Sequence, residues 1–291
     1  MDVQHPRRRT TVRLTALVGS VALLASGCSA EAQRGYLPGY EDGPVTNMTE
    51  RITSLWTGSW IAALLVGLIT WGLILWCVVV YRKRRDDETL PVQIRYHVPL
   101  EIMYVILPIL MIGVLFFYTE RDMSAIEDIS AEPDLTVQVI GKQWSWDFNY
   151  VDDDVYETGV HVDDIGVEGV SETLPTLYLP VDERVEIQLE ARDVIHSFWV
   201  PAFLYKKDMI PGRSNVFQIV PLREGTYAGK CAELCGEHHS GMLFNVTVLP
   251  RAEYDAQMDL LRERGQTGQL GVELNRLQSR GDDQAIPSGE G

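Results

Sequence analysis

Residues 230–242 read Lys-Cys-Ala-Glu-Leu-Cys-Gly-Glu-His-His-Ser-Gly-Met, and this stretch decides how the rest of the chain is interpreted. Cys231 and Cys235 are four residues apart, His239 follows four residues later, and Met242 comes three residues after that. Two thiolates, an imidazole and a thioether on one short segment are the soft ligands that copper uses in electron-transfer sites. The stretch therefore predicts a copper site.

The number of thiols indicates how many copper ions the site holds. A blue-copper site takes two His, one Cys and a weak axial Met from a β-sandwich, and His196 is expected to supply the second imidazole. The additional thiol of Cys235 changes the stoichiometry, because two thiolates can bridge two copper ions that each have one terminal imidazole. Met242 would then complete one copper, and the backbone carbonyl of Glu233 would complete the other.

Other interpretations of these residues stay open. Structural zinc prefers two Cys and two His, and Met242 would be a poor zinc ligand. A Cys231–Cys235 disulfide is sterically possible in an exporting compartment, although it leaves the other donors unexplained. A mononuclear copper site would leave one thiolate unused. His238 could replace His239, but the spacing from the second cysteine favours His239.

The region around this stretch has the pattern of a β-sandwich. Trp144, Trp146, Phe148 and Tyr150 alternate with polar residues, so one face of this strand is aromatic and is expected to face a core. An aromatic that reached the surface near a redox metal would instead receive electrons. Turn residues separate the other strands, as in a sandwich or barrel. Further strands are expected at 177–180, 185–189, 194–200, 215–220, 225–230 and 243–249.

The N-terminal residues 1–28 have the layout of a secretory signal peptide. Four arginines precede a short apolar run, which is too short for a stable membrane span. The following Ser26-Gly27-Cys28 resembles a bacterial lipobox, with Ala25 where leucine is usual, so lipidation of Cys28 is expected. Ordinary cleavage with a free Cys28, or no cleavage, is the alternative.

Two apolar runs predict a pair of membrane spans. The first has no charged residue and is followed by Arg82-Lys83-Arg84-Arg85, which places that end in the cytoplasm. The second contains Pro108, which a packed membrane helix tolerates. The predicted order is an external segment (29–54), a first span (55–81), a cytoplasmic loop (82–97), a second span (98–118), a linker (119–134), a sandwich domain outside the membrane (135–250), and a C-terminal helix and tail (251–291).

Charged residues give two further hypotheses. Glu101 lies within the second span, where an ionisable group commonly serves a proton path; the alternative is a carboxylate that reaches the headgroups near Arg95. The chain has a net charge of −16, and residues 152–172 contain eight acidic residues and no Lys or Arg. This acidic insertion is either a solvated loop or a docking surface for a basic partner. No nucleic-acid partner is expected.

Taken together, these motifs resemble subunit II of haem–copper cytochrome c oxidases of the two-span bacterial aa3 type, over about residues 50–250. The acidic insertion and the long tail depart from the common core of that family. The resemblance rests on Leu100-Glu101-Ile102 with Ile106-Leu107-Pro108, on Gly141-Lys142-Gln143-Trp144-Ser145-Trp146, on Asp193-Val-Ile-His196-Ser-Phe-Trp-Val-Pro, on Ile210-Pro-Gly-Arg-Ser-Asn, and on residues 231–242.

The resemblance implies a fold and an activity. The fold would be a two-helix transmembrane hairpin followed by an all-β cupredoxin domain, a Greek-key β-sandwich. That domain would hold the dinuclear CuA centre and pass electrons from cytochrome c to haem in subunit I, which reduces oxygen and pumps protons. Trp144 would receive the electrons, the Glu233 side chain would touch a Mg²⁺ or Mn²⁺ shared with subunit I, and Glu101 would lie at the mouth of a proton channel.

The expected setting is a bacterial plasma membrane, with the copper domain on its outer side. The expected partners are oxidase subunits I and III, membrane lipids, and cytochrome c or a tethered cytochrome c domain of a bc1-type complex. On this hypothesis the chain alone reduces no oxygen. Two alternatives are a quinol oxidase subunit II, which lacks the copper ligands, and a membrane-tethered copper-delivery protein.

Overall fold

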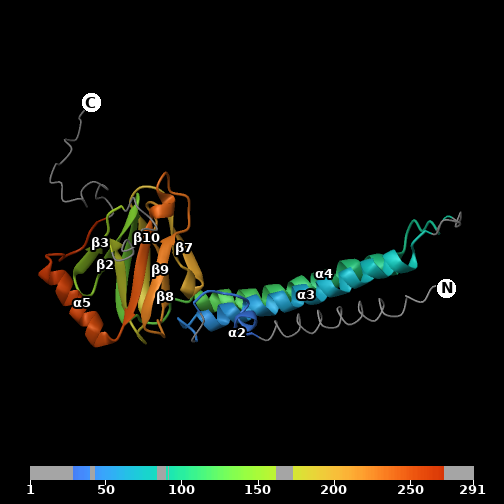
Figure 1. Ribbon diagram of the computed structural model, residues 1–291, viewed down its shortest axis with the longest axis horizontal. Helices are drawn as coiled ribbons and strands as arrows, with labels where there is room; N and C mark the ends of the chain where they lie inside the picture. Colours follow the sequence, from blue (N-terminus) through green and yellow to red (C-terminus); the bar gives the residue numbers. More distant parts are fainter. Residues whose placement is uncertain (1–28, 40–42, 84–89, 91, 162–172, 272–291) are drawn as a thin grey trace, which may run out of the picture. The chain divides into compact units, whose positions relative to one another are not determined.

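The computed structural model describes residues 29–39, 43–83, 90, 92–161 and 173–271. The predicted signal peptide with Cys28 lies outside the described residues. The chain forms two compact units, one containing most of two long helices and the other containing the strands. Figure 1 shows the two long helices and the strands.

The helical unit contains α2 (Ala30–Gln33) and most of α3 (Thr49–Val80) and α4 (Val98–Ile126). The two long helices run side by side in opposite directions (Figure 1), and Arg51 near the start of α3 forms an ion pair of 3.0 Å with Asp122 near the end of α4. Their apolar side chains are exposed along most of their length, which a water-soluble surface does not tolerate. Both helices are long and apolar enough to cross a membrane.

Both helices are longer than the spans predicted from the sequence. α3 begins at Thr49 instead of residue 55, and α4 continues to Ile126 instead of ending at residue 118. An apolar run marks the length of helix that lipid would surround, whereas intrahelical hydrogen bonds can continue into polar sequence. Consequently the predicted external segment and the predicted linker each contribute residues to a helix.

The other unit is a sandwich of two five-stranded sheets with strand orders β3-β2-β1-β5-β8 and β4-β10-β9-β6-β7. The pairs β1–β5 and β4–β10 are parallel, and all the other pairs among the described strands are antiparallel. The expected fold class, two apolar helices followed by a β-sandwich, is confirmed. The strands are β1 (Leu135–Lys142), β2 (Ser145–Tyr150), β3 (Val155–Thr158), β4 (Thr176–Pro180), β5 (Val185–Ala191), β6 (His196–Val200), β7 (Tyr205–Met209), β8 (Asn215–Ile219), β9 (Gly225–Cys231) and β10 (Leu243–Leu249).

An aromatic cluster fills the space between the sheets. Phe244 of β10 lies 4.7 Å from Trp146, 5.8 Å from Phe148 and 5.0 Å from Phe198, measured between ring centroids. All four side chains are buried, and for Trp146 and Phe148 the alternation along β2 predicts this. Trp144 precedes β2 and remains half-exposed, so it departs from this core pattern.

Two strands were not expected from the sequence. β3 lies inside the predicted acidic insertion, and β7 reads Tyr-Lys-Lys-Asp-Met. Each is an edge strand of its sheet, where one side of the backbone needs no partner and charged side chains face water. The remainder of the predicted insertion, residues 162–172, lies outside the described residues.

The C-terminal part of the chain packs against the sandwich, where its helix contacts β3 of the first sheet and β4 and β10 of the second. Helix α5 (Arg251–Glu263) buries Tyr254, Met258 and Leu261 at helical spacing. Beyond it, the amide of Asn149 makes two hydrogen bonds to the backbone of Leu270, and Arg192 donates to the carbonyl of Gly271. The first part of the predicted tail is therefore held on the sheet as far as Gly271, where the described residues end.

Candidate metal centre

The predicted ligands come from two adjacent strands and the loop between β9 and β10. His196 begins β6 and Cys231 ends β9, which pairs with β6. The loop then returns on itself, because the Cys231 amide donates to the carbonyl oxygen of Met242 over 3.0 Å. Before that return, a single 3-10 turn, η3 (His239–Gly241), presents the second histidine. The chain fold thus brings distant parts of the sequence to one end of the sandwich.

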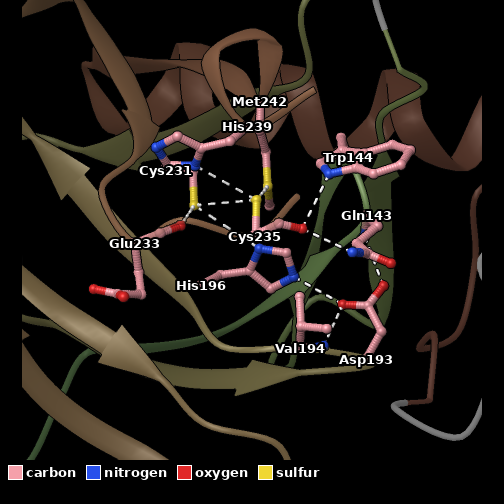
Figure 2. Close-up of polar contacts among 10 residues, drawn as sticks. All are labelled: Gln143, Trp144, Asp193, Val194, His196, Cys231, Glu233, Cys235, His239 and Met242. Atoms are coloured by element: carbon pink, nitrogen blue, oxygen red, sulfur yellow. Dashed lines mark hydrogen bonds and ion pairs between the residues drawn. The ribbon is translucent and has the colours of Figure 1, made fainter. Parts of the chain in front are cut away.

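Two thiols form the middle of the centre (Figure 2). The Cys231 and Cys235 sulfurs are 3.9 Å apart and are not bonded to each other. His196 Nδ1 lies 3.8 Å from the Cys231 sulfur, whereas His239 Nδ1 lies 3.5 Å from the Cys235 sulfur. Each sulfur therefore has its own imidazole, on different sides of the pair.

Two weaker donors complete the set. The Met242 sulfur lies 3.7 Å from that of Cys235, and the backbone carbonyl oxygen of Glu233 lies 3.2 Å from that of Cys231. The Glu233 side chain is exposed and points away from the sulfurs (Figure 2). The carbonyl oxygen and the carboxylate of this residue therefore face different surroundings. The prediction assigns the carbonyl to copper and the carboxylate to a Mg²⁺ or Mn²⁺.

The centre is enclosed except at one histidine. His196, Cys231, Cys235 and Met242 each have at most 4% of their surface exposed, while His239 is half-buried. The donor atoms of His196, Cys231 and Cys235 all lie within 4.8 Å of one another, close enough to share a metal ion. A buried, sulfur-rich site of this kind favours a soft metal.

The two thiols differ in acidity without metal. A hydrogen bond between them lowers the pKa of Cys231 to about 3 despite its burial, and the same contact raises the pKa of Cys235. Burial lowers the pKa of His196, but hydrogen bonds to Asp193 and Cys231 outweigh this effect, so the pKa is raised. The first proton to leave the thiol pair is therefore that of Cys231.

Asp193 orients His196 from behind, a role that was not predicted. One oxygen of its carboxylate lies 2.8 Å from His196 Nε2, which turns Nδ1 toward the sulfur. The other oxygen accepts a hydrogen bond of 2.7 Å from the backbone N–H of Gln143. Carboxylates placed behind ligating histidines fix the ring and its tautomer. The only signal in the sequence was an acidic residue three positions before the histidine.

Gly141 makes room for the same imidazole. A Cβ atom at this position of β1 would lie 2.8 Å from the His196 ring, closer than any side chain tolerates. This glycine belongs to the Gly141-Lys142-Gln143-Trp144 stretch that was noted in the sequence, but its packing role could not be inferred from one sequence.

Trp144 lies beside the centre. Its indole N–H donates to the carbonyl oxygen of Cys235 over 3.2 Å, and the side-chain amide of Gln143 donates to the same oxygen over 2.7 Å. The side chain is half-buried, so part of the ring reaches the surface. Trp144 therefore joins the surface of the domain to the backbone of a predicted ligand.

Glu101 is distant in sequence from the centre and has a local structural role. Its carboxylate accepts the backbone N–H of His97 over 2.9 Å, while the His97 ring accepts the N–H of Leu100 over 3.2 Å. Such reciprocal bonds cap the first turn of a helix, here α4. Capping explains the position of this carboxylate without a proton path, and the proton-path role stays a prediction.

Comparisons with known proteins identify the family. A family model described as cytochrome c oxidase subunit II, periplasmic domain, matches residues 135–249. A relative in Streptomyces avermitilis, a probable cytochrome c oxidase subunit 2, is 43% identical over 90% of this chain and 89% of its own length. The chain belongs to the cytochrome c oxidase subunit 2 family.

Other members are more distant. Cytochrome c oxidase subunit 2 of Mycobacterium tuberculosis is 33% identical over 84% of this chain and 80% of its own length. The crystal structure of the periplasmic domain of cytochrome oxidase subunit II of Bradyrhizobium japonicum is 29% identical and covers 47% of this chain and 99% of that one, with a TM-score of 0.43. As a subunit 2, the chain is part of a terminal oxidase.

Proposed function

We propose that this subunit 2 carries a dinuclear copper centre, accepts electrons from cytochrome c and passes them to haem in subunit I of the oxidase. One observation carries the proposal: the two thiols are 3.9 Å apart, and each has a separate imidazole within 3.8 Å. A pair of sulfurs flanked by one imidazole on each side suits two metal ions better than one.

The donor set fits copper better than the alternatives. Zinc would use a closed tetrahedron of Cys and His and would leave Met242 without a role. A disulfide would need sulfurs about 2 Å apart, whereas here they are separated by 3.9 Å and each is directed at an imidazole. A single copper bound by both imidazoles, one thiolate and Met242 would leave the second thiolate unused. Soft sulfur and imidazole donors in a largely buried site match copper.

We assign the ligands as follows from their contacts. Cys231 and Cys235 would bridge the two ions, His196 and His239 would be terminal, and the weak donors would complete one ion each. When bound, the thiolate-bridged copper pair would supply a one-electron carrier. The ligand set is then His196, Cys231, the Glu233 carbonyl, Cys235, His239 and Met242.

The residues around the ligands keep the centre rigid. Asp193 holds the His196 ring, and Gln143 ties the turn before β2 to both Asp193 and the Cys235 carbonyl. A rigid, buried donor set reduces the rearrangement that accompanies a change of charge. Trp144 is the proposed electron-receiving residue, since its ring is partly exposed and its N–H contacts a ligand residue.

The membrane setting follows from the helices and from the relatives. We propose that α3 and α4 both span a bacterial plasma membrane, with the copper domain on the outer side and subunits I and III beside it. The Glu233 side chain would contact a Mg²⁺ or Mn²⁺ at subunit I, Glu101 would serve a proton channel, and Cys28 would carry a lipid. A copper-delivery protein is disfavoured, because the Streptomyces avermitilis and Mycobacterium tuberculosis relatives, which the chain matches over 80% or more of their length, are oxidase subunits.

Purification of the assembled oxidase in mild detergent tests the proposal. We expect subunit I to co-purify, two copper ions per copy of this chain in addition to any copper in subunit I, and the EPR spectrum of a mixed-valent copper pair. A single copper with an ordinary mononuclear spectrum, or zinc in its place, would refute the dinuclear assignment. Turnover with reduced quinol but not with cytochrome c would refute the proposed donor.

A further inference from the structure

Two histidines outside the ligand set contact Trp144. The ring of His238 lies 4.7 Å from that of Trp144 at an angle of 70°, and the ring of His161 lies 5.9 Å away at 60°, measured between centroids and planes. The two imidazoles are 4.3 Å from each other. We name Trp144, His161 and His238 the three-ring cluster. Its members come from the turn before β2, the segment after β3, and the loop before β10.

The ligand loop supports another part of the Trp144 ring. The indole N–H donates to the Cys235 carbonyl, and a Cβ atom at Gly236 would lie 3.1 Å from the indole ring. Because Gly236 has no side chain and has φ of 123°, the ring can lie against the loop there. Trp144 is thus fixed by one hydrogen bond, by the glycine surface and by two imidazoles.

The backbone that carries His161 has little freedom. The Ser145 hydroxyl donates to the carbonyl oxygen of Val160 over 3.2 Å, and the Gly159 N–H donates to that of Trp146 over 2.9 Å. A Cβ atom at Gly159 would come within 2.4 Å of Pro175, so only glycine fits this close approach. The segment is therefore fastened to β2 immediately beside Trp144, and His161 reaches the indole from a fixed position.

We propose that His161 and His238 are positioning residues, which hold the Trp144 ring in the orientation that its hydrogen bond to Cys235 requires. The proposal rests on the proposed function, in which electrons arrive through Trp144. A single hydrogen bond leaves an indole free to turn about its side-chain torsions, whereas edge-to-face ring contacts restrict that rotation. Neither histidine is placed among the copper ligands, so their effect on the reaction would act through the indole.

His161→Ala in the assembled oxidase is the decisive variant. A change at His238 could disturb the adjoining proposed ligand His239, whereas His161 is remote from the ligands in the sequence. We expect kcat with cytochrome c to fall about threefold to tenfold, the range that lost aromatic contacts support, with KM and the copper spectrum unchanged. Val160→Ala is the matched control, since Val160 precedes His161 and is 53% exposed. If His161→Ala behaves like Val160→Ala, the proposal is wrong.

A double variant separates positioning from direct contact with the electron donor. If His161 acts through the indole, His161→Ala should add almost nothing to Trp144→Ala. A full additional decrease in the double variant would mean that His161 touches the donor itself, and would overturn the proposal.

A second readout does not depend on turnover. In the full chain, the indole N–H of Trp144 should exchange with solvent faster in His161→Ala and His238→Ala than in Val160→Ala, because its hydrogen bond opens more often. Unchanged exchange would overturn the positioning role. Absence of a copper pair, or full activity in Trp144→Ala, would instead refute the proposed function. The exchange result would still show whether the two histidines position the indole.

Discussion

The indole N–H of Trp144 donates a hydrogen bond of 3.2 Å to the carbonyl oxygen of Cys235. Trp144 reaches the surface, whereas the Cys235 sulfur is buried 3.9 Å from that of Cys231. The route from the surface to the sulfur pair therefore consists of covalent bonds and one hydrogen bond. This continuity is the structural basis for treating Trp144 as more than a core aromatic.

Trp144→Phe keeps an aromatic ring and removes only the N–H donor. We expect electron transfer from cytochrome c to slow about twofold to tenfold, as loss of one hydrogen bond allows, with unchanged copper content. Trp144→Ala should slow it further. Stopped-flow reduction of the assembled oxidase measures the rate, and Trp199→Phe, on β6 of the other sheet, is the control. Loss of copper in Trp144→Phe would show that the residue is structural.

Cys231→Ser and Cys235→Ser should each remove the dinuclear centre. A hydroxyl is too hard and too weakly acidic to bridge two copper ions, so metal analysis should give fewer than two copper ions in this subunit. Cys77→Ser is the matched control, because this cysteine is exposed on α3 and has no place in the centre. Two copper ions and normal electron transfer in either ligand variant would exclude bridging.

Asp193→Asn should weaken copper binding while leaving all the proposed ligands in place. The carboxylate holds His196 Nε2, and loss of such a partner commonly costs about 10-fold to 100-fold in metal affinity. Competition with a copper chelator measures this affinity. Glu224→Gln, an exposed carboxylate in the turn before β9, controls for the change of charge. Equal affinity in the two variants would remove Asp193 from the centre.

The sequence was sufficient to nominate the proposed ligands but not the residues that support them. Cys231, Cys235, His239 and Met242 share one short segment, and soft donors at such spacing have few other uses. Asp193 could not be assigned from the sequence, because an isolated carboxylate has many roles and its contact with His196 depends on the tertiary fold.

The fold was predictable where apolar and polar residue types alternate with a period of two. The β2 pattern revealed a core strand, but β7 exposes Lys206 and Asp208 and belongs to the sheet through backbone pairing. The docking of residues 266–271 was equally hidden. Asn149 and Arg192 hold that segment through its backbone, and backbone contacts leave no mark on the residue types of the segment.

The acidic character of the chain should appear in the kinetics of electron transfer. With a net charge of −16, the subunit should attract a basic donor, so the second-order rate with cytochrome c should fall as salt rises. Measurement at several ionic strengths, with an uncharged small-molecule reductant as the control, tests this. A flat response would indicate a donor that is permanently attached to the oxidase.

Glu127 should stabilise the sandwich in a pH-dependent manner. Its carboxylate accepts a hydrogen bond of 2.7 Å from the Tyr205 hydroxyl and pairs with Lys207, both on edge strand β7. Burial raises its pKa, but the bonds from Lys207 and Tyr205 outweigh burial and lower it below the ordinary value of 4.5. A lowered folded-state pKa means that this stabilisation is complete above the unfolded-state pKa and is lost as the pH falls through the folded-state pKa.

Glu127→Gln should accordingly lower the thermal midpoint at neutral pH and have little effect in acid. The side chain is 39% exposed, so we expect a loss of at most about 1 kcal/mol in the free energy of unfolding. Thermal unfolding of the full chain, followed from neutral pH downward, gives the difference between variant and wild type. Glu132 is an exposed carboxylate in the same linker, and Glu132→Gln should show no difference from wild type that disappears in acid. A difference that persists or grows in acid would mean that Glu127 contributes through packing rather than through its charge.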